Sequence, residues 1–212
     1  MSPTVISVQA GIPRTVLRDG EKVLTGIFKT PVQKRLRMSA LNLEGDRQAD
    51  LSVHGGRDKA VYAYPSEHYA YWKNELPGIE LPWGSFGENL TTEGLLESDV
   101  GLGDSFTIGT AEVVVTQPRL PCFKLNLKFD RDDMVKRFLA SRRTGFYFRV
   151  LHEGEIGAGD EIVRVHQDEN RVSISDALKI YLGEPDSDEL RERALRVQYL
   201  SASWRKGFSQ RA

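Results

Sequence analysis

The segment Gly45–Tyr64, with the sequence GDRQADLSVHGGRDKAVYAY, decides how the rest of this chain is interpreted. Charged and polar side chains dominate it as far as Lys59, and two adjacent glycines lie in its middle. Such a segment cannot be buried without leaving polar groups unpaired, so we expect a loop that leads into the strand Ala60–Tyr64. The glycines would let backbone amides approach a ligand closely, and Arg57 and Lys59 add positive charge. Composition alone favours an anion-binding loop and a solvated loop about equally.

Short strands separated by turn residues are predicted on both sides of this segment. Alternating or β-branched runs predict strands at Val5–Gln9, Thr15–Arg18, Glu21–Phe28, Gln33–Met38, Ser105–Ile108, Ala111–Thr116, Phe146–Leu151 and Glu161–Val165. Asp19 and Gly20 predict a hairpin turn. The similar sequences GLGD and GAGD, at Gly101–Asp104 and Gly157–Asp160, are typical of tight turns before strands, and no helix follows them as a phosphate-binding loop requires. This pattern favours a mainly β fold with a few helices, arranged as a closed or half-closed barrel.

Two helices are predicted among the strands. Ser66 is expected to cap a helix over Glu67–Glu75, and Asp132 is expected to cap a second one that turns Met134 and Phe138 inward. Both helices are short, so the strands still dominate this part of the chain.

The end of the chain is predicted to be helical, unlike the strand-rich part that precedes it. Residues 167–212 are predicted to form three short helices that follow a β-barrel domain spanning residues 1–166. The predicted helix caps are Ser173, in a capping box with Asp176, then Ser187 or Asp186, and then Ser201 or Ser203. Helices of this length do not fold alone, so we expect them to pack on the barrel or on a second copy of the chain in a homodimer. Their many arginines are typical of a solvated helix face.

Composition excludes several classes of protein. The 29 Lys and Arg and 30 Asp and Glu residues give a formal net charge of −1, which removes the electrostatic argument for binding nucleic acid or an anionic membrane. No apolar run reaches the roughly 20 residues of a membrane span, and Met1–Gly20 lacks the layout of a signal peptide. A single cysteine, Cys122, excludes an internal disulfide and any zinc site or iron–sulfur cluster held by four cysteines. We therefore expect a cytoplasmic protein.

Two further polar segments are candidates for a site. Gly84–Leu90 combines flanking glycines with amide and carboxylate side chains, and by itself indicates only a turn before a strand. Gln117–Leu125 follows an apolar strand, and its two prolines predict a rigid, extended rim. In an extended chain Cys122 and Lys124 point the same way, with Arg119 close by. A lone cysteine is more often a small buried apolar residue, but the prolines and cations here favour a reactive or metal-binding thiolate.

Together these segments resemble the MOSC domain, the module named after the C-terminal part of molybdenum cofactor sulfurases. The segments that carry the resemblance are, in chain order, Gly45–Tyr64, Gly84–Leu90, Gly101–Asp104 and Gln117–Leu125. The continuation of the first segment to Tyr69, and the tail from Val172 to Arg205, resemble the YiiM-like subgroup, which carries a three-helix extension. The resemblance covers nearly the whole chain and implies a distorted MOSC-type β-barrel.

The resemblance also implies a cofactor, the molybdenum cofactor (molybdopterin), and no pyridoxal phosphate is expected. Cys122 matches the family's cysteine, which implies that it is the catalytic residue and a thiolate ligand of the metal. The residues assigned to cofactor binding are His54, Arg57, Lys59, Ser85, Asn89, Arg119 and Lys124. The cations among them would face the phosphate, the pterin or the oxo groups of the metal, and the amide and hydroxyl would read the pterin edge.

The reaction implied by the resemblance is the reduction of an N–OH group to an amine, as in relatives that detoxify N-hydroxylated bases such as 6-hydroxylaminopurine. Unlike some relatives, this chain has no fused iron–sulfur domain, and it has no flavin motif. Electrons would therefore come from a separate protein of the flavodoxin or ferredoxin type, with a flavin reductase. Two other functions stay open: a non-catalytic module that binds or carries the cofactor, and sulfur transfer through a persulfide on Cys122.

Overall fold

The computed structural model describes residues 2–18, 20–49 and 55–210. Its strands are β1 (Thr4–Ala10), β2 (Arg14–Arg18), β3 (Glu21–Thr25), β4 (Thr30–Pro31), β5 (Leu36–Met38), β6 (Val61–Pro65), β7 (Leu90–Glu93), β8 (Ser105–Ile108), β9 (Ala111–Pro118), β10 (Phe146–His152), β11 (Gly154–Ile156) and β12 (Ile162–His166). Its helices are the short 3-10 helix η1 (Arg57–Lys59) and α1 (His68–Glu75), α2 (Phe123–Phe129), α3 (Met134–Ser141), α4 (Ile174–Leu182), α5 (Asp188–Arg196) and α6 (Ala202–Ser209). Within these ranges, every helix is too short or too polar to cross a membrane.

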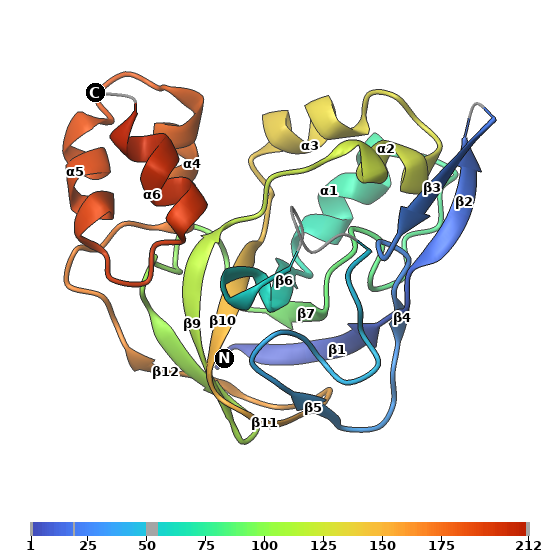
Figure 1. Ribbon diagram of the computed structural model, residues 1–212, viewed down its shortest axis with the longest axis horizontal. Coiled ribbons are helices and arrows are strands. Elements are labelled where there is room, and N and C mark those ends of the chain that lie inside the picture. Colours follow the sequence, from blue (N-terminus) through green and yellow to red (C-terminus); the bar gives the residue numbers. More distant parts are fainter. Residues whose placement is uncertain (1, 19, 50–54, 211–212) are drawn as a thin grey trace.

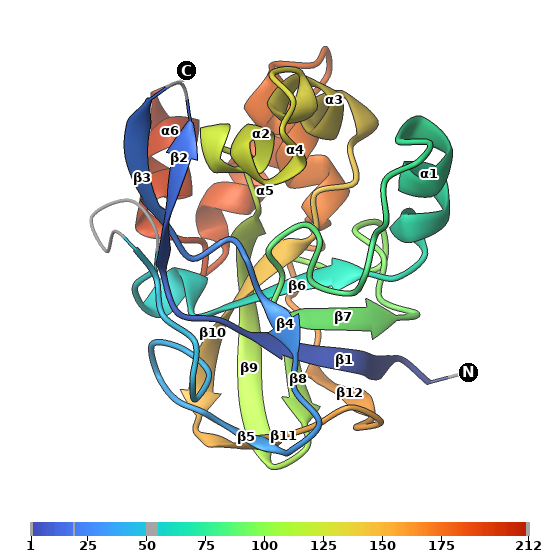
Figure 2. The same ribbon diagram turned by 90° about the vertical axis from the view of Figure 1, so that its right-hand side faces the viewer.

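Eight strands form one curled sheet, in the order β12-β8-β9-β10-β6-β7-β1-β4. The β6–β7 pair is parallel, and the other neighbours are antiparallel. Backbone hydrogen bonds also tie β1 to the segment before β12: Val5 N donates to Asp160 O at 2.9 Å, and Gly159 N donates to Val5 O at 2.8 Å. The sheet therefore curls so that its β12 edge comes back to β1, as in a distorted barrel (Figures 1 and 2). The prediction of a mainly β fold with helices is confirmed.

The predicted strands are found, with shifted ends in several cases. The strand β8 has its predicted bounds, and β2 pairs with β3 as the predicted hairpin, although Asp19 of its turn lies outside the described residues. The strand β9 continues past the predicted Thr116 to Pro118. The expected strand Gln33–Met38 is reduced to β5, because the chain bends at Gln33 and Lys34.

The two GxGD turns have the same local structure. In each, the aspartate carboxylate accepts a hydrogen bond from the first glycine: Asp104 Oδ2 from Gly101 N at 2.9 Å, and Asp160 Oδ2 from Gly157 N at 2.8 Å. The third residue of each turn is a glycine with φ of +82° or +89°, a conformation that other residues rarely adopt. The strands β8 and β12 follow directly, so these segments are turns that begin strands, as predicted.

The helices lie toward one end of the barrel (Figures 1 and 2). As predicted, α3 buries Met134 and Phe138. The predicted caps of α1 and α3 are wrong by one residue, since Glu67 and Asp133 occupy the N-cap positions. The reason is that the polar side chains expected to cap these helices are engaged elsewhere. The hydroxyl of Ser66 contacts the Glu67 carboxylate, and Asp132 pairs with Arg18.

The three C-terminal helices begin where the sequence predicts. The capping box of α4 is present, with Ser173 Oγ accepting from Asp176 N at 3.0 Å, and Ser187 and Ser201 occupy the N-cap positions of α5 and α6. Buried apolar side chains of all three helices belong to the same core as those of β8, β9 and β10. The helices therefore pack on the barrel, while the predicted domain boundary after residue 166 stays a prediction.

Candidate functional site

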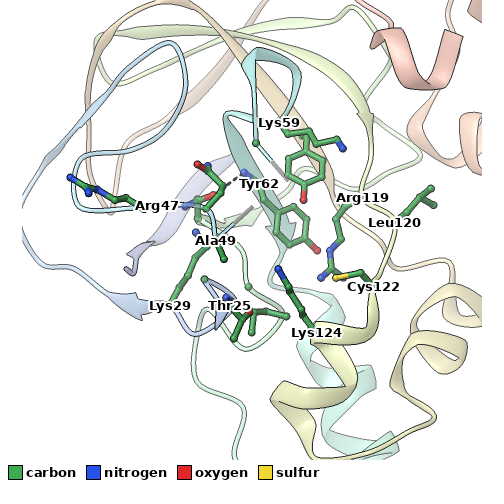
Figure 3. A pocket seen from close by; sticks show the side chains of 17 residues that line it. Thr25, Lys29, Arg47, Ala49, Lys59, Tyr62, Arg119, Leu120, Cys122 and Lys124 are labelled. Carbon is green, nitrogen blue, oxygen red and sulfur yellow. Dashed lines mark hydrogen bonds between the residues drawn. The ribbon is translucent and has the colours of Figure 1, made fainter. Parts of the chain in front are cut away.

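A cavity lies where the loops that follow β3, precede β6 and follow β9 meet the start of α2 (Figure 3). The cationic side chains that line it are Lys29, Arg47, Lys59, Arg119 and Lys124. Among the described residues of its wall, none carries a carboxylate. Cations from the segments that follow β3, precede β6 and follow β9 give the cavity a positive potential that suits an anion.

Arg119 is buried in the wall of this cavity, at 6% exposure. Its guanidinium lies 5.2 Å from the ring centre of Tyr62 and 4.9 Å from that of Phe138, and it hydrogen-bonds Tyr147. Burial works to lower its pKa, but the neighbouring Tyr62, Tyr147 and Cys122 raise it overall, so the guanidinium stays charged. Its Nη1 atom is buried and has no hydrogen-bond partner among the described residues. A buried charged donor in this state has an unused capacity for one acceptor, which makes Arg119 a candidate ligand-binding residue.

Cys122 lies beside Arg119 in the same wall (Figure 3). It is partly exposed, and its extended backbone forms the N-cap of α2. The prediction of an extended rim as far as Leu125 is therefore wrong, because the chain turns helical at Phe123. Leu125 and Phe129, four residues apart, share the buried face of this helix, which explains the change. Lys124, in the first turn of α2, lines the cavity together with the thiol.

Lys59 reaches the cavity from η1. Burial lowers its pKa, and the adjacent Asp58 acts in the opposite direction. The short helix is fastened to the sheet through Asp58: Arg149 Nε donates to its carboxylate at 2.8 Å, and Thr116 Oγ1 donates to its carbonyl at 2.6 Å. The two glycines before η1 have φ of +100° and +80°, so this close turn depends on glycine. The backbone that carries Lys59 is thus held against the sheet by the contacts of Asp58.

Two described residues that were predicted to bind a cofactor, Arg57 and Ser85, lie outside the wall of the cavity. Arg57 is exposed and lies outside the lining. Ser85 is buried elsewhere, and its Oγ donates to Pro82 O at 2.6 Å. His54 lies outside the described residues, so its role stays a prediction.

Asn89 lines the cavity, but its side chain is largely used by the fold. Its Oδ1 accepts from Tyr62 N at 3.1 Å, and its Nδ2 donates to Asp46 Oδ2 at 2.9 Å. Asn89 thereby joins β6 to the loop that carries Arg47. We therefore regard it as a residue that shapes the cavity.

Sequence reasoning did not assign several residues of the wall to the site, among them Lys29, Arg47, Tyr62 and Tyr147. Lys29 forms a buried ion pair with Asp46; burial lowers the pKa of this lysine and the pairing partly offsets the effect. The two tyrosines are register partners in β6 and β10, and their ring centres are 5.3 Å apart. Only the pairing of distant strands brings them together. The available signal was their position in predicted strands, which does not say which strands become neighbours.

Comparisons with known proteins agree with one another. The family model of the MOSC domain matches residues 50–163. YflK of Bacillus subtilis is 42% identical over 208 residues, which cover 98% of this chain and 94% of YflK. The crystal structure of YiiM from Geobacillus stearothermophilus has a TM-score of 0.82 and 38% identity, with 99% of this chain and 98% of that chain covered. A protein of Gibberella moniliformis named a reductase is 35% identical over 161 residues, which cover 74% of this chain but only 28% of that longer protein.

Proposed function

This chain belongs to the MOSC domain family and is YiiM-like, and on that premise we propose that it binds a molybdenum cofactor in the cation-lined cavity and reduces N-hydroxylated compounds to amines. The observation that carries the proposal is the buried Nη1 of Arg119, which lacks an acceptor among the described residues and lies beside the Cys122 thiol. A ligand with anionic or carbonyl oxygens would satisfy this donor.

The residues present suit this cofactor in two ways. The cations of the wall, with no described carboxylate among them, suit a phosphate group. The Cys122 thiolate is a soft ligand of the kind that suits a metal held by other sulfur atoms. The described part of the chain contains no group of three His, Cys, Asp or Glu side chains that could hold a metal ion. The metal would therefore have to arrive with ligands of its own, as it does in a pterin dithiolene.

The roles of the side chains follow from their positions. When bound, the cofactor supplies two-electron redox chemistry that protein side chains do not supply. Arg119 would hold an oxygen of the ligand through Nη1, and Lys59 and Lys124 would balance the phosphate charge. Tyr62 and Tyr147 form the wall around the guanidinium and keep water from it. The overall reaction is R–NH–OH + 2 e⁻ + 2 H⁺ → R–NH₂ + H₂O.

An oxidoreductase is also supported by the relative from Gibberella moniliformis that is named a reductase. Because the sequence contains no flavin or nicotinamide motif, we infer that electrons come from a separate carrier of the flavodoxin or ferredoxin type. The cations at the mouth of the cavity would attract such an acidic partner, and turnover should fall as salt screens the attraction.

The test is metal and pterin analysis of the protein purified from a molybdenum-sufficient host, followed by anaerobic assay with a reduced dye and 6-hydroxylaminopurine. We expect equimolar molybdenum and pterin, and reduction of the substrate. NADH alone should support no turnover until a flavin reductase and a small carrier are added. Bound cofactor without turnover would instead indicate a carrier, and a cyanolysable sulfur on Cys122 without molybdenum would indicate sulfur transfer. Absence of both metal and pterin would reject the proposal.

A further inference from the structure

A second cavity adjoins the cation-lined one, and the C-terminal helices form its far wall. Its volume is about 380 Å³, within the range of pockets that hold small molecules. Lys59, Leu120, Cys122 and Tyr147 line both cavities, so the two share one wall. The opposite wall comes from α4 and α6, which stand beside the end of β9 in Figure 1.

The chemistry of the second cavity differs from that of the first. Its far wall is largely aromatic: the rings of Tyr181 and Trp204 are 5.4 Å apart and tilted by 38°, and Phe208 meets Trp204 edge-on, also at 5.4 Å. Among its described lining residues, Lys59 is the only charged one, and it stands on the wall shared with the first cavity. Trp204 and Phe208 are only 5% and 1% exposed, so they form the floor of this wall, and the partly buried side chains at its surface are Leu120, Pro121 and Tyr181. An uncharged surface of this kind suits the apolar part of a neutral molecule.

Gly207 lines this cavity from α6. It lies inside α6, where glycine is a poor helix former, and its backbone does not need a positive φ. A Cβ built at this position meets no atom within 4 Å. The open space beside Gly207 belongs to the cavity, since the residue lines it. A larger side chain here would fill the cavity without displacing the described core.

We propose that the aromatic cavity receives the flat, uncharged part of the substrate, and that Tyr181 of α4 and Gly207 of α6, backed by the buried Trp204 and Phe208, set which substrates enter. The reaction assigned to the substrate rests on the proposed function, but the cavity itself does not. Bound in this way, the substrate points its N–OH group towards the shared wall, where Cys122 and Lys59 lie. The three-helix region is then a part of the substrate site.

The test is titration calorimetry of the full-length protein as purified, with benzamidoxime as a neutral aromatic probe and N-hydroxyurea as a probe without a ring. Gly207→Leu should weaken benzamidoxime binding at least tenfold and leave the melting temperature equal or higher. Gly207→Ala should cause a smaller loss and covers the case in which the leucine variant fails to fold. Ala202→Leu is the matched control, because it adds similar bulk to an exposed site of the same helix outside the cavity.

The outcomes separate this inference from the proposed function. Wild-type affinity for benzamidoxime in folded Gly207→Leu and Gly207→Ala, or no binding of benzamidoxime by the wild type, would overturn the cavity assignment. Equal affinity of the wild type for N-hydroxyurea would overturn the role of the aromatic wall. Binding that depends on Gly207 in a protein that holds no molybdenum would support the cavity while rejecting the proposed reduction.

Discussion

Two polar segments, Gly84–Leu90 and Arg119–Lys124, both bury a charged side chain but use it in opposite ways. In the first, the fully buried Glu88 carboxylate accepts hydrogen bonds from two backbone N–H groups, a threonine hydroxyl and the Tyr69 hydroxyl. In the second, the buried Arg119 guanidinium keeps one nitrogen without an acceptor among the described residues. A buried charge whose partners all come from the protein stabilises the fold. A buried guanidinium that keeps one nitrogen without an acceptor in the wall of a cavity is a candidate for binding a ligand.

The largest effect is expected at Cys122, the only thiol of the chain. Cys122→Ser should abolish molybdenum retention and activity, because a hydroxyl does not replace a soft thiolate ligand. The side chain is nearly the same size and partly exposed, so the free energy of unfolding should change by at most about 1–2 kcal/mol. Metal analysis and urea denaturation measure the two effects. A serine variant with full metal content would show that Cys122 is not the ligand.

The Glu88 carboxylate should matter for stability and not for the ligand. In Glu88→Gln, an amide N–H₂ replaces one acceptor oxygen and so faces a backbone donor, either Gly84 N at the position of Oε1 or Phe86 N at that of Oε2. Hydrogen bonds to a charged group contribute roughly 1.5–3 kcal/mol each, so we expect a loss of about 3 kcal/mol. Urea denaturation measures the loss. Molybdenum per folded molecule should stay at the wild-type level, and a selective loss of metal would contradict the comparison.

Arg119→Met should weaken cofactor binding and leave stability almost unchanged, the reverse of what we expect for Glu88→Gln. The variant removes a buried guanidinium with an unsatisfied nitrogen, so the lost contacts with the Tyr62 ring and Tyr147 are offset by the removed cost of burying the charge. Stability should change by less than about 1 kcal/mol. Cofactor affinity should fall roughly tenfold to hundredfold, as expected for a lost charge-assisted contact. Equal occupancy in a cofactor titration of the variant and the wild type would show that Nη1 does not bind the ligand.

Most of the barrel was predictable because its strands alternate locally and are separated by turn residues. The capping box of α4 is equally local, since Ser173 and Asp176 are three residues apart. The prediction that failed, an extended segment as far as Leu125, concerned a local pattern that both a strand and a helix can carry. Phe123, Leu125, Leu127 and Phe129 alternate as a strand would, yet they form α2, because its inward face packs against the aromatic cluster that includes Phe86 and Phe138. Tertiary packing overrode the pattern.

The cavity was predictable only in part, for a different reason. Lys59, Arg119, Cys122 and Lys124 occur in segments whose composition is unusual, and these residues do come together. Tyr147 reaches the same wall only through the pairing of β10 with β6, which no local pattern specifies. Conversely, Ser85 was assigned to the site because a glycine-flanked polar turn looks the same in sequence whether its groups bind a ligand or the protein itself.

Lys59 and Arg57 give a smaller and more selective test, since they are two residues apart in η1. Lys59 lines both cavities, whereas Arg57 is exposed and lines neither. Lys59→Ala should therefore weaken cofactor binding about tenfold, and the matched Arg57→Ala less than twofold. A cofactor titration of both variants checks this. Equal losses would mean that the loop acts through its net charge and not through the placed ammonium of Lys59.

Lys128 links the segments Gly84–Leu90 and Arg119–Lys124. It lies in α2, which begins directly after Cys122, and its ammonium donates to Gly84 O at 2.7 Å and to Ile27 O at 3.2 Å. Burial lowers the pKa of Lys128 from 10.5 to about 8, with Glu88 acting in the opposite direction and Lys29 in the same one. Its charge is therefore less favourable in the folded protein than in the unfolded chain.

The smallest effect is the contribution of Lys128 to the pH dependence of stability. Below about pH 8 the lysine is protonated in both states, so the folded protein bears the full cost of burying the charge. As the pH rises towards 10.5 the folded state loses this proton first, the unfolded state binds more protons, and stability increases. Between about pH 7.5 and 9.5, the free energy of unfolding of the wild type should rise by up to about 2 kcal/mol relative to that of Lys128→Met. Lost hydrogen bonds to Gly84 O and Ile27 O lower the stability of the variant at every pH and do not change this slope. Urea denaturation between about pH 7.5 and 9.5 measures the free energy of unfolding of both proteins. If the two free energies change with pH in parallel, the pKa of the Lys128 ammonium is not lowered in the folded protein.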